Sequence, residues 1–209
     1  SKNIITNFFK FFYYLLNTPF FLIWKNDFKK IIMEANIVCN SNFIKSEILK
    51  LSPSLEATVE YPLLDIPHLE EIKNFRKKSQ KKYITLVGAT AVKGHDIVQS
   101  LASKFPFETF QVFDDRNIVK EPVAKNIKYI YFKGIKEIYQ NSKIVIIPSQ
   151  WPEAYSRVAA EAKFLDIPTI ASLTGGIPEA CSEKAILVED FTNLADWENK
   201  LNRLLEKLA

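Results

Sequence analysis

From residue 83 onward, short runs of apolar residues alternate with longer segments of helical periodicity. Continuous Val, Ile and aromatic runs of this length are typical of strands buried on both faces of a parallel sheet. The expected strands are YITLVG (83–88), TFQVFD (109–114), IKYIYF (127–132), KIVIIP (143–148), PTIAS (168–172) and AILVE (185–189). The alternation predicts an α/β fold with a Rossmann-like, doubly wound parallel sheet.

The first 65 residues do not continue this alternation. They suggest two helices, a short strand NIVCN (36–40), a helix NFIKSEILK (42–50) and the segment TVEYPLLD (58–65). This order is typical of the last βα unit of a preceding domain followed by a crossover. We therefore expect residues 1–65 to be the tail of an N-terminal domain with the crossover, and residues 66–209 to be the Rossmann-like domain.

Composition and charge limit the classes of partner. Apolar residues make up 47% of the chain and charged residues 25%, as in ordinary soluble domains. The net charge of +4 owes much to RKKSQKK (76–82), which is expected to be a solvated segment, with contact to anionic lipid as the alternative. Nucleic-acid binding is not indicated. Cys39 and Cys181 lack metal-ligand spacing and indicate reduced thiols in a cytoplasmic protein.

The aromatic segment 7–24, NFFKFFYYLLNTPFFLIW, is interrupted near its middle by Asn17, Thr18 and Pro19. A spanning helix needs about 20 consecutive apolar residues, so a transmembrane helix is not expected. Without a small-residue cleavage site, the segment does not indicate a signal peptide either. It is expected to be a buried helix of a larger fold, with an amphipathic surface that contacts a membrane or another domain as the alternative.

Two glutamates in the segment 147–180 could carry chemistry. Glu153 and Glu161 lie eight residues apart, across what is expected to be the start of a helix. Glu161 shares a helix face with Val158 and Leu165, so its carboxylate needs a partner, either a basic side chain or ligand hydroxyl groups. Eight helical residues span about 12 Å, which matches the reach from a hexose across a diphosphate to a ribose. A helix N-terminus near Glu153 would suit the diphosphate.

Two further segments are expected at the same edge of the sheet. In LVGATAVKGHD, Gly88 closes the first strand and Lys93 supplies a positive charge for phosphate oxygens. Neither the dinucleotide fingerprint nor the P-loop spacing is present. The segment GGIPE (175–179) follows the fifth strand, and its two glycines give backbone freedom beside the same crevice.

The stretch PSQWPEAYSRVAAEAKFLDIPTIASLTGGIPE resembles the signature of glycosyltransferase family 4, whose members have the GT-B fold of two Rossmann-like domains. The resemblance extends back through VGATAVKGHD to ANIVCNSNFIKSEI. It implies the C-terminal, donor-binding domain with a remnant of the N-terminal domain. It also implies transfer of a hexose from a nucleotide-sugar to a glycan or lipid-linked acceptor with retention, in surface polysaccharide biosynthesis.

The resemblance also implies the roles of residues. Lys93 and Glu153 would be catalytic: Glu153 binds hydroxyl groups of the donor sugar, and Lys93 binds the diphosphate and stabilises the leaving group. Glu161 would bind the ribose, and the loop around Lys133 to Ile135 would lie near the nucleobase. The full donor-binding set is Gly88, Lys93, Gly134, Ile135, Glu153, Ala154, Tyr155, Ser156, Arg157, Val158 and Glu161. No cofactor or metal is expected.

Three positions depart from the family pattern. Ala89 lies where many members have an arginine, and Ser156 and Asp166 replace common glycines. The family's acceptor-binding half is missing, because two such domains need more residues than this chain has. Activity would then need that missing N-terminal domain or a partner chain. The alternatives are a nucleotide-sugar epimerase of the same fold and a non-catalytic binding half. The expected location is the cytoplasm, free or at the inner face of the membrane.

Overall fold

The computed structural model describes residues 35–114, 124–131 and 134–208. The predictions for the aromatic segment 7–24 and for Lys133 lie outside the described residues. Among the helices of the described part, none is long and apolar enough to cross a membrane.

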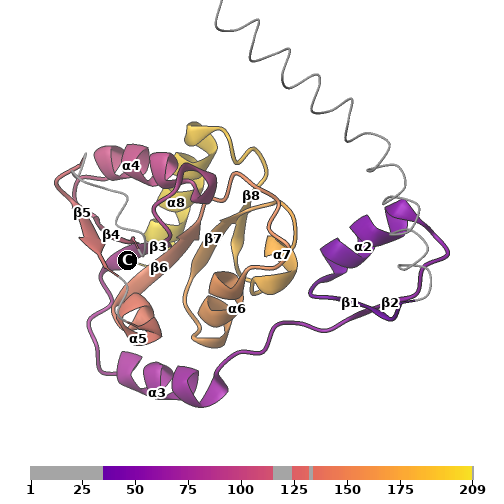
Figure 1. Cartoon of the computed structure of the whole chain (residues 1–209). Helices are drawn as coiled ribbons and strands as arrows, with labels where there is room; N and C mark the ends of the chain where they lie inside the picture. Colours follow the sequence, from indigo (N-terminus) through magenta and orange to yellow (C-terminus); the bar gives the residue numbers. More distant parts are fainter. Residues whose placement is uncertain (1–34, 115–123, 132–133, 209) are drawn as a thin grey trace, which may run out of the picture.

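A six-stranded parallel sheet forms the centre of the molecule (Figure 1). Its strands are β3 (Tyr83–Val87), β4 (Thr109–Phe113), β5 (Ile127–Ile130), β6 (Ser142–Ile147), β7 (Thr169–Ser172) and β8 (Ile186–Val188). Each corresponds to one of the six expected apolar runs, with ends that differ by at most two residues. The Rossmann-like parallel sheet predicted from the sequence is confirmed.

The strand order is β5-β4-β3-β6-β7-β8. The chain therefore adds β4 and β5 on one side of β3, and then crosses over to add β6, β7 and β8 on the other. The neighbouring strands β3 and β6 flank the point at which the direction of winding reverses. Ligands of open α/β sheets bind at such a point, beside the carboxyl ends of the strands.

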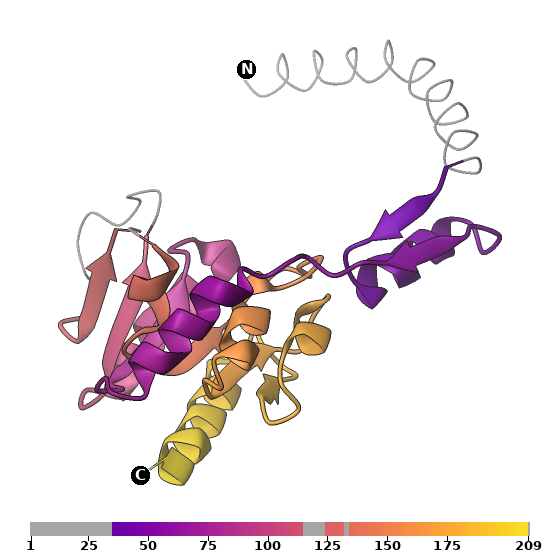
Figure 2. The ribbon, with the colours of Figure 1, turned by 90° about the horizontal axis from the view of Figure 1, so that it is seen from below.

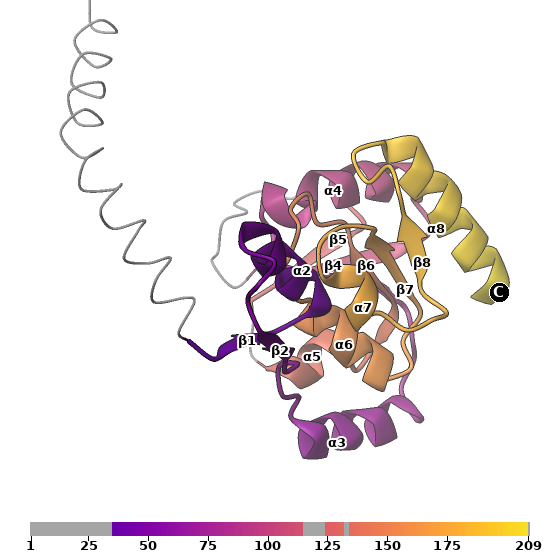
Figure 3. The same ribbon diagram turned by 90° about the vertical axis from the view of Figure 1, so that its right-hand side faces the viewer.

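Helices cover both faces of this sheet (Figures 1 and 3). On one face α4 (His95–Lys104) and α8 (Leu194–Leu208) pack on a core that includes Ile146 and the fully buried Trp197. On the other face lie α3 (Ile66–Arg76), α5 (Ile135–Tyr139), α6 (Arg157–Phe164) and α7 (Ile177–Ala180). A short 3₁₀ helix, η1 (Ala91–Lys93), precedes α4. The sheet is thus buried on both faces, as its apolar strands require.

Helix α3 was not expected from the sequence. The Asp65 side chain accepts a hydrogen bond from the N–H of His68, and a proline lies in the first turn. Both are start signals for a helix. The buried Leu69 and Ile72 pack on the core beneath α6. The basic run 76–82 therefore begins at the last residue of a packed helix, and its exposed lysines follow.

A small N-terminal unit stands beside this domain (Figures 1 and 2). It consists of β1 (Ile37–Cys39), α2 (Asn42–Leu51) and β2 (Ala57–Val59). The two strands form a separate parallel sheet, with Val38 opposite Thr58. Strand β1 and helix α2 match the expected βα unit, whereas β2, which overlaps the start of TVEYPLLD, was not expected as a strand. An extended segment connects the unit to α3.

Candidate functional site

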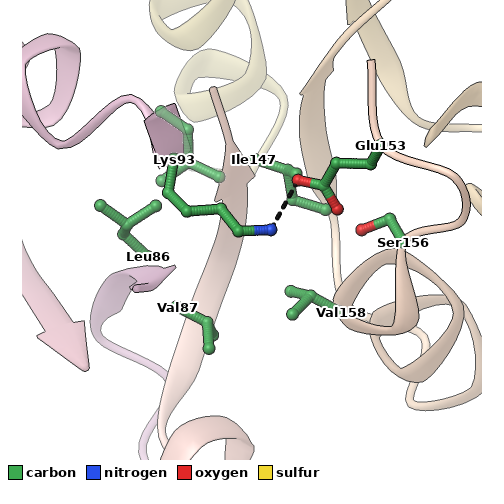
Figure 4. Close-up of a pocket in the computed structure, with 8 residues that line it drawn as sticks. Leu86, Val87, Lys93, Ile147, Glu153, Ser156 and Val158 are labelled. Atoms are coloured by element: carbon green, nitrogen blue, oxygen red, sulfur yellow. Dashed lines mark hydrogen bonds and ion pairs between the residues drawn. The ribbon is translucent and has the colours of Figure 1, made fainter. Parts of the chain in front are cut away.

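A pocket lies between the carboxyl ends of β3 and β6, at the reversal of the winding (Figure 4). It holds about 240 Å³ of space, part of it open to solvent. Its lining residues are Leu86, Val87, Lys93, Ile146, Ile147, Glu153, Ser156 and Val158.

Lys93 and Glu153 meet across this pocket. The Nζ atom of Lys93 lies 2.8 Å from Oε1 of Glu153, and Figure 4 shows the two side chains pointing toward each other from opposite walls. The Lys93 side chain is 42% exposed and that of Glu153 is 10% exposed. The ion pair therefore joins a nearly buried carboxylate to an ammonium group that solvent or a ligand can reach.

The turn after β3 sets the position of Lys93. The Thr90 hydroxyl accepts from the Lys93 N–H and caps η1, which ends at Gly94 in the left-handed conformation, with φ of 75°. A Cβ atom on Gly94 would lie 1.9 Å from the carbonyl oxygen of Pro148. Only glycine lets this turn pack directly against the end of β6. Gly94 thus fixes the position of the preceding Lys93.

The glycine pair after β7 sets the position of Glu153. The Gly176 N–H donates to the carbonyl oxygen of Glu153 over 2.7 Å. Gly175 has φ of 57°, and a Cβ atom there would lie 2.5 Å from the same oxygen. The backbone freedom expected of the two glycines thus allows a close approach to the loop that carries Glu153.

Helix α6 begins later than the sequence suggested. Its N-cap is Ser156, whose hydroxyl accepts from the Ala159 N–H, so residues 153–156 form a loop and not a helical turn. The 12 Å separation of Glu153 and Glu161, which assumed continuous helix, does not apply. The loop turns the Glu153 carboxylate back toward β3 instead.

Glu161 has a different environment from Glu153. Its Oε2 accepts from the hydroxyl of the fully buried Tyr139 over 2.6 Å, and its Oε1 lies 3.3 Å from Nη2 of Arg157. Burial raises the pKa of Glu161, while the bonds from Tyr139 and Arg157 lower it in part. Burial and the neighbouring Glu161 raise the pKa of Tyr139 well above its usual value. The partner that the sequence required is present within the chain.

The structure brings together only some of the predicted donor-binding residues. Lys93, Glu153, Ser156 and Val158 line the pocket, and Gly88, with φ of 100°, lies against the Lys93 side chain. Ala154 and Tyr155 complete the loop before α6, whereas Arg157 and Glu161 lie on α6 outside the pocket lining. Gly134 and Ile135 begin α5. In the described part of the chain, no group of acidic, histidine and cysteine side chains could hold a metal ion.

Comparisons with known proteins concern the family and the fold. Residues 116–208 match the model of the family described as "Glycosyl transferases group 1". No curated protein matches the sequence significantly.

Solved structures extend the likeness to most of the chain. A glycosyltransferase from Rickettsia africae is 20% identical, with a TM-score of 0.70 over 88% of this chain and 58% of its own. Sucrose-phosphate synthase from Thermosynechococcus elongatus is 15% identical, with a TM-score of 0.70 over 86% and 51%. HepE from Anabaena, in complex with UDP, is 19% identical, with a TM-score of 0.65 over 82% and 54%.

The six-stranded domain has the Rossmann-like fold of one half of a GT-B glycosyltransferase. The chain spans about half the length of these solved structures, from 51% to 58%.

Sequence reasoning missed two residues at the site. Tyr139 follows no recognisable motif, and only its position at the end of a short helix places its hydroxyl beneath Glu161. Glu179 was expected only as the last residue of the segment GGIPE, with no contact assigned to it. In the structure its carboxylate binds the N-terminus of α2. A glutamate that follows a glycine pair and a proline gives no signal of that contact.

Proposed function

We propose that this chain is the donor-binding half of a family 4 glycosyltransferase that transfers a hexose from a nucleotide-sugar. The observation that carries the proposal is the Lys93–Glu153 pair. Two segments 60 residues apart place a lysine and a carboxylate 2.8 Å from each other at the carboxyl ends of the strands where winding reverses. A cationic group beside an acceptor of hydroxyl hydrogen bonds suits a sugar diphosphate.

In the proposed reaction, Glu153 accepts hydrogen bonds from hydroxyl groups of the hexose. The bond between the anomeric carbon and the diphosphate oxygen breaks, and its electron pair stays on that oxygen. The oxygen of the acceptor hydroxyl group forms the new bond to the same carbon on the same face, and the hydroxyl proton passes to the departing diphosphate oxygen. Lys93 leaves the Glu153 carboxylate and donates to the diphosphate, whose charge increases as the bond breaks. The partial exposure of Lys93 supports this exchange of partners.

The remaining assignments follow the family resemblance. Backbone N–H groups of Ala154 to Ser156 lie beside the sugar, Glu161 binds the ribose, and Gly134 and Ile135 lie near the nucleobase. A ribose would share the Glu161 carboxylate with Tyr139 and Arg157. Lys93 and the first N–H groups of α6 would supply positive charge, so the proposed reaction uses no bound metal.

The acceptor and the pathway are proposed from the family resemblance alone. We propose a glycan or lipid-linked acceptor, retention of configuration, and a role in surface polysaccharide assembly at the cytoplasmic side of the membrane. The acceptor-binding half would come from an N-terminal domain or a partner chain outside these 209 residues. Residues 1–65 would then belong to that half and to the crossover.

The proposal is tested by binding, which does not need the acceptor half. Isothermal calorimetry would measure UDP-, GDP- and ADP-sugars against the chain and against Lys93→Ala. We expect one nucleotide class to bind, and Lys93→Ala to weaken it by about 1–3 kcal/mol through loss of charge-assisted hydrogen bonds. Lys184→Ala, at an exposed position, is the control for charge alone. Binding of no nucleotide, or equal effects of the two variants, would contradict the proposal.

A non-catalytic binding half is the second candidate. It predicts nucleotide-sugar binding without release of sugar or transfer to any acceptor until a second subunit is added. Incubation with UDP-N-acetylglucosamine alone also tests an epimerase, which would form free sugar or its epimer without an acceptor.

A further inference from the structure

The N-terminal unit contacts the Rossmann-like domain through the carboxylate of Glu179. Oε2 accepts from the backbone N–H of Asn42 over 2.9 Å, and Oε1 accepts from the backbone N–H of Phe43 over 3.0 Å. The Asn42 side-chain amide donates to Oε2 over 3.1 Å as well. One carboxylate from α7 therefore binds the start of a helix that precedes it by more than 130 residues.

These contacts complete the N-terminus of α2. The first N–H groups of a helix have no acceptor within the helix. Ser41, the N-cap, accepts from Ile44 over 3.0 Å, and Glu179 accepts from the two N–H groups before it. The negative charge of Glu179 also lies at the positive end of the α2 dipole. The cap is shared between the two units and so depends on how they sit together.

Tyr61, in the extended segment after β2, connects the same contact to the pocket loop. Its hydroxyl donates to Oε2 of Glu179 over 3.1 Å and accepts from Nδ2 of Asn42 over 2.7 Å. Its ring lies 5.4 Å from the ring of Tyr155, at 37°. Tyr155 belongs to the pocket loop, residues 153–156 before α6, so Tyr61 contacts both the Glu179 carboxylate and this loop.

Glu179 is also joined to the pocket through its own segment. It lies three residues after Gly176, whose N–H holds the carbonyl oxygen of Glu153. The pocket carboxylate is thus reached from the N-terminal unit by two routes, one through Tyr61 and Tyr155 and one through Glu179 and the glycine pair. A shift of either unit would change both routes together.

We propose that Glu179 is a positioning residue that couples the seating of the N-terminal unit to the geometry of the Glu153 loop. The consequence for nucleotide-sugar binding rests on the proposed function, but the coupling does not. When α2 is docked, Glu179 and Tyr61 hold the loop so that Glu153 faces Lys93. When α2 moves away, the carboxylate loses its donors and the loop loosens.

The protonation of Glu179 is consistent with this role. Partial burial by itself would raise the pKa of Glu179, but the bonds from Phe43, Asn42 and Tyr61 outweigh it, so the pKa is lowered. The docked state thus favours the charged carboxylate that the cap needs. Burial and the adjacent Glu179 also raise the pKa of Tyr61, which keeps its hydroxyl protonated as a donor.

Amide hydrogen exchange of the full 209-residue chain without ligand tests the coupling. Glu179→Gln keeps the shape but places an NH₂ group against one of the two backbone donors. We expect exchange at Asn42, Phe43 and Gly176 to become faster by about tenfold, the change for the loss of one hydrogen bond to a charged group. Exchange at Val145, whose N–H donates to Pro168 in the sheet, reports global opening and should not change.

Two controls separate the outcomes. Glu183→Gln makes the same charge change at an exposed position four residues on, and should change none of these amides. Tyr61→Phe keeps the ring against Tyr155 but removes the hydroxyl, and should give a smaller rise at the same three amides. If Val145 also exchanges faster in Glu179→Gln, the domain itself is destabilised and Tyr61→Phe decides.

Two results would overturn the coupling. If exchange becomes faster at Asn42 and Phe43 but does not change at Gly176, Glu179 is a helix cap alone. The variant that decides this is Glu179→Gln, or Tyr61→Phe if Val145 also exchanges faster in Glu179→Gln. Unchanged exchange at Asn42 and Phe43 would show that Glu179 does not cap α2 either. Failure of the proposed function is a separate result, since a wild-type chain that binds no nucleotide can still show the exchange pattern. Where the wild type binds a nucleotide-sugar, Glu179→Gln should weaken that binding, although residue 179 does not contact the ligand.

Discussion

Glu153 and Glu161 are equally buried, at 8% and 6% exposure, but their surroundings differ. Glu153 lies in a loop and pairs with Lys93, which comes from the other side of the pocket and is partly exposed. Glu161 lies within α6 and accepts from Tyr139, which is fully buried, and from Arg157 one turn before it on the same helix. One carboxylate faces a cleft, and the other faces the core.

The difference shows that the partner, and not the depth, decides what a buried carboxylate can do. A ligand can displace Lys93 from Glu153, because the lysine can reach solvent and phosphate. It cannot displace the Tyr139 hydroxyl without opening the core beneath α6. We therefore expect Glu153 to respond to ligands and Glu161 to combine a structural role with the binding of a ribose at its remaining lone pairs.

The largest expected effect comes from the glycine that seats Glu153. In Gly175→Ala, the new Cβ atom would lie 2.5 Å from the Glu153 carbonyl oxygen at a φ of 57°. We expect the free energy of unfolding to fall by about 2–4 kcal/mol, from left-handed strain and overpacking together. Chemical denaturation measures it.

Gly134→Ala is the matched control for Gly175→Ala. The backbone at Gly134 is extended, and its Cβ atom would meet only the end of the Glu137 side chain, at 2.9 Å. Gly134→Ala should lower the free energy of unfolding by less than about 1 kcal/mol, as is usual for a substitution at the surface. Equal losses in the free energy of unfolding of the two variants would show that the close approach of Gly175 to the Glu153 carbonyl oxygen does not determine stability.

Ligand binding separates the two carboxylates next. Under the proposed function, Glu153→Gln should weaken a nucleotide-sugar by about 1–3 kcal/mol but leave the nucleoside diphosphate alone or tighten it, because Lys93 loses its ion-pair partner. Glu161→Ala should weaken both ligands by a similar amount, since both contain the ribose. Calorimetry with the two ligands and the two variants gives the four comparisons.

The pattern of losses is more informative than their size. If Glu153→Gln weakens both ligands equally, the carboxylate does not face the sugar. If Glu161→Ala changes neither, Glu161 belongs to the core alone and the ribose assignment is wrong. Circular dichroism of both variants checks that the domain remains folded.

The sequence predicted the sheet well because its strands are buried on both faces. Runs such as KIVIIP have few other stable locations, so all six strands and the position of the crevice could be read directly. The motif segments also met as expected, because the carboxyl ends of parallel strands share one edge. Lys93 and Glu153 are the clearest case.

Local geometry at the site could not be read in the same way. The periodicity of 154–165 continues into the loop, so nothing in the pattern marks Ser156 as the N-cap of α6. Tyr139 and Glu179 act through contacts between segments 22 and 136 residues apart. Such contacts depend on how helices pack on the sheet, which a single sequence does not fix. Helix α3 was different, since Asp65 and the proline after it were readable signals.

Tyr139→Phe tests the core side of the comparison. Loss of the hydroxyl leaves the Glu161 Oε2 without its buried donor, and we expect a loss of about 1–2 kcal/mol of stability at neutral pH. Tyr131→Phe, at an exposed tyrosine, is the control and should change little.

The pH dependence of Tyr139→Phe has a definite sign. Burial already raises the pKa of Glu161, and the hydrogen bond from Tyr139 counteracts this rise. Without the donor the folded-state pKa rises further, so the penalty grows as pH increases from the unfolded value through the folded one. The difference in stability between wild type and variant should therefore shrink in acid. A constant difference at all pH values would show that the hydroxyl does not sense the charge of Glu161.

The smallest effect is expected at the far end of α6. Asp166 has a φ of 53°, in the left-handed region, and its Oδ2 lies 2.6 Å from Nζ of Lys73 on α3. Asp166→Gly relieves left-handed strain, which costs about 1–2 kcal/mol for a residue with a side chain and less for aspartate. It also removes an ion pair whose side chains are 39% and 75% exposed, worth about 0–1 kcal/mol. The net change should be a stabilisation below about 1 kcal/mol.

Two further variants at this position separate the strain from the charge. Asp166→Asn keeps the tolerance for the left-handed region but removes the ion pair, so its loss measures the pair alone. Asp166→Ala has neither and should be the least stable of the three. Lys73 keeps a bond to the carbonyl oxygen of Phe164 in every variant, at 3.1 Å, which holds α3 against α6. Because Asp166 lies beyond the last turn of α6, nucleotide affinity should stay constant across the series, and a change in affinity would mean that the two ends of α6 do not act independently.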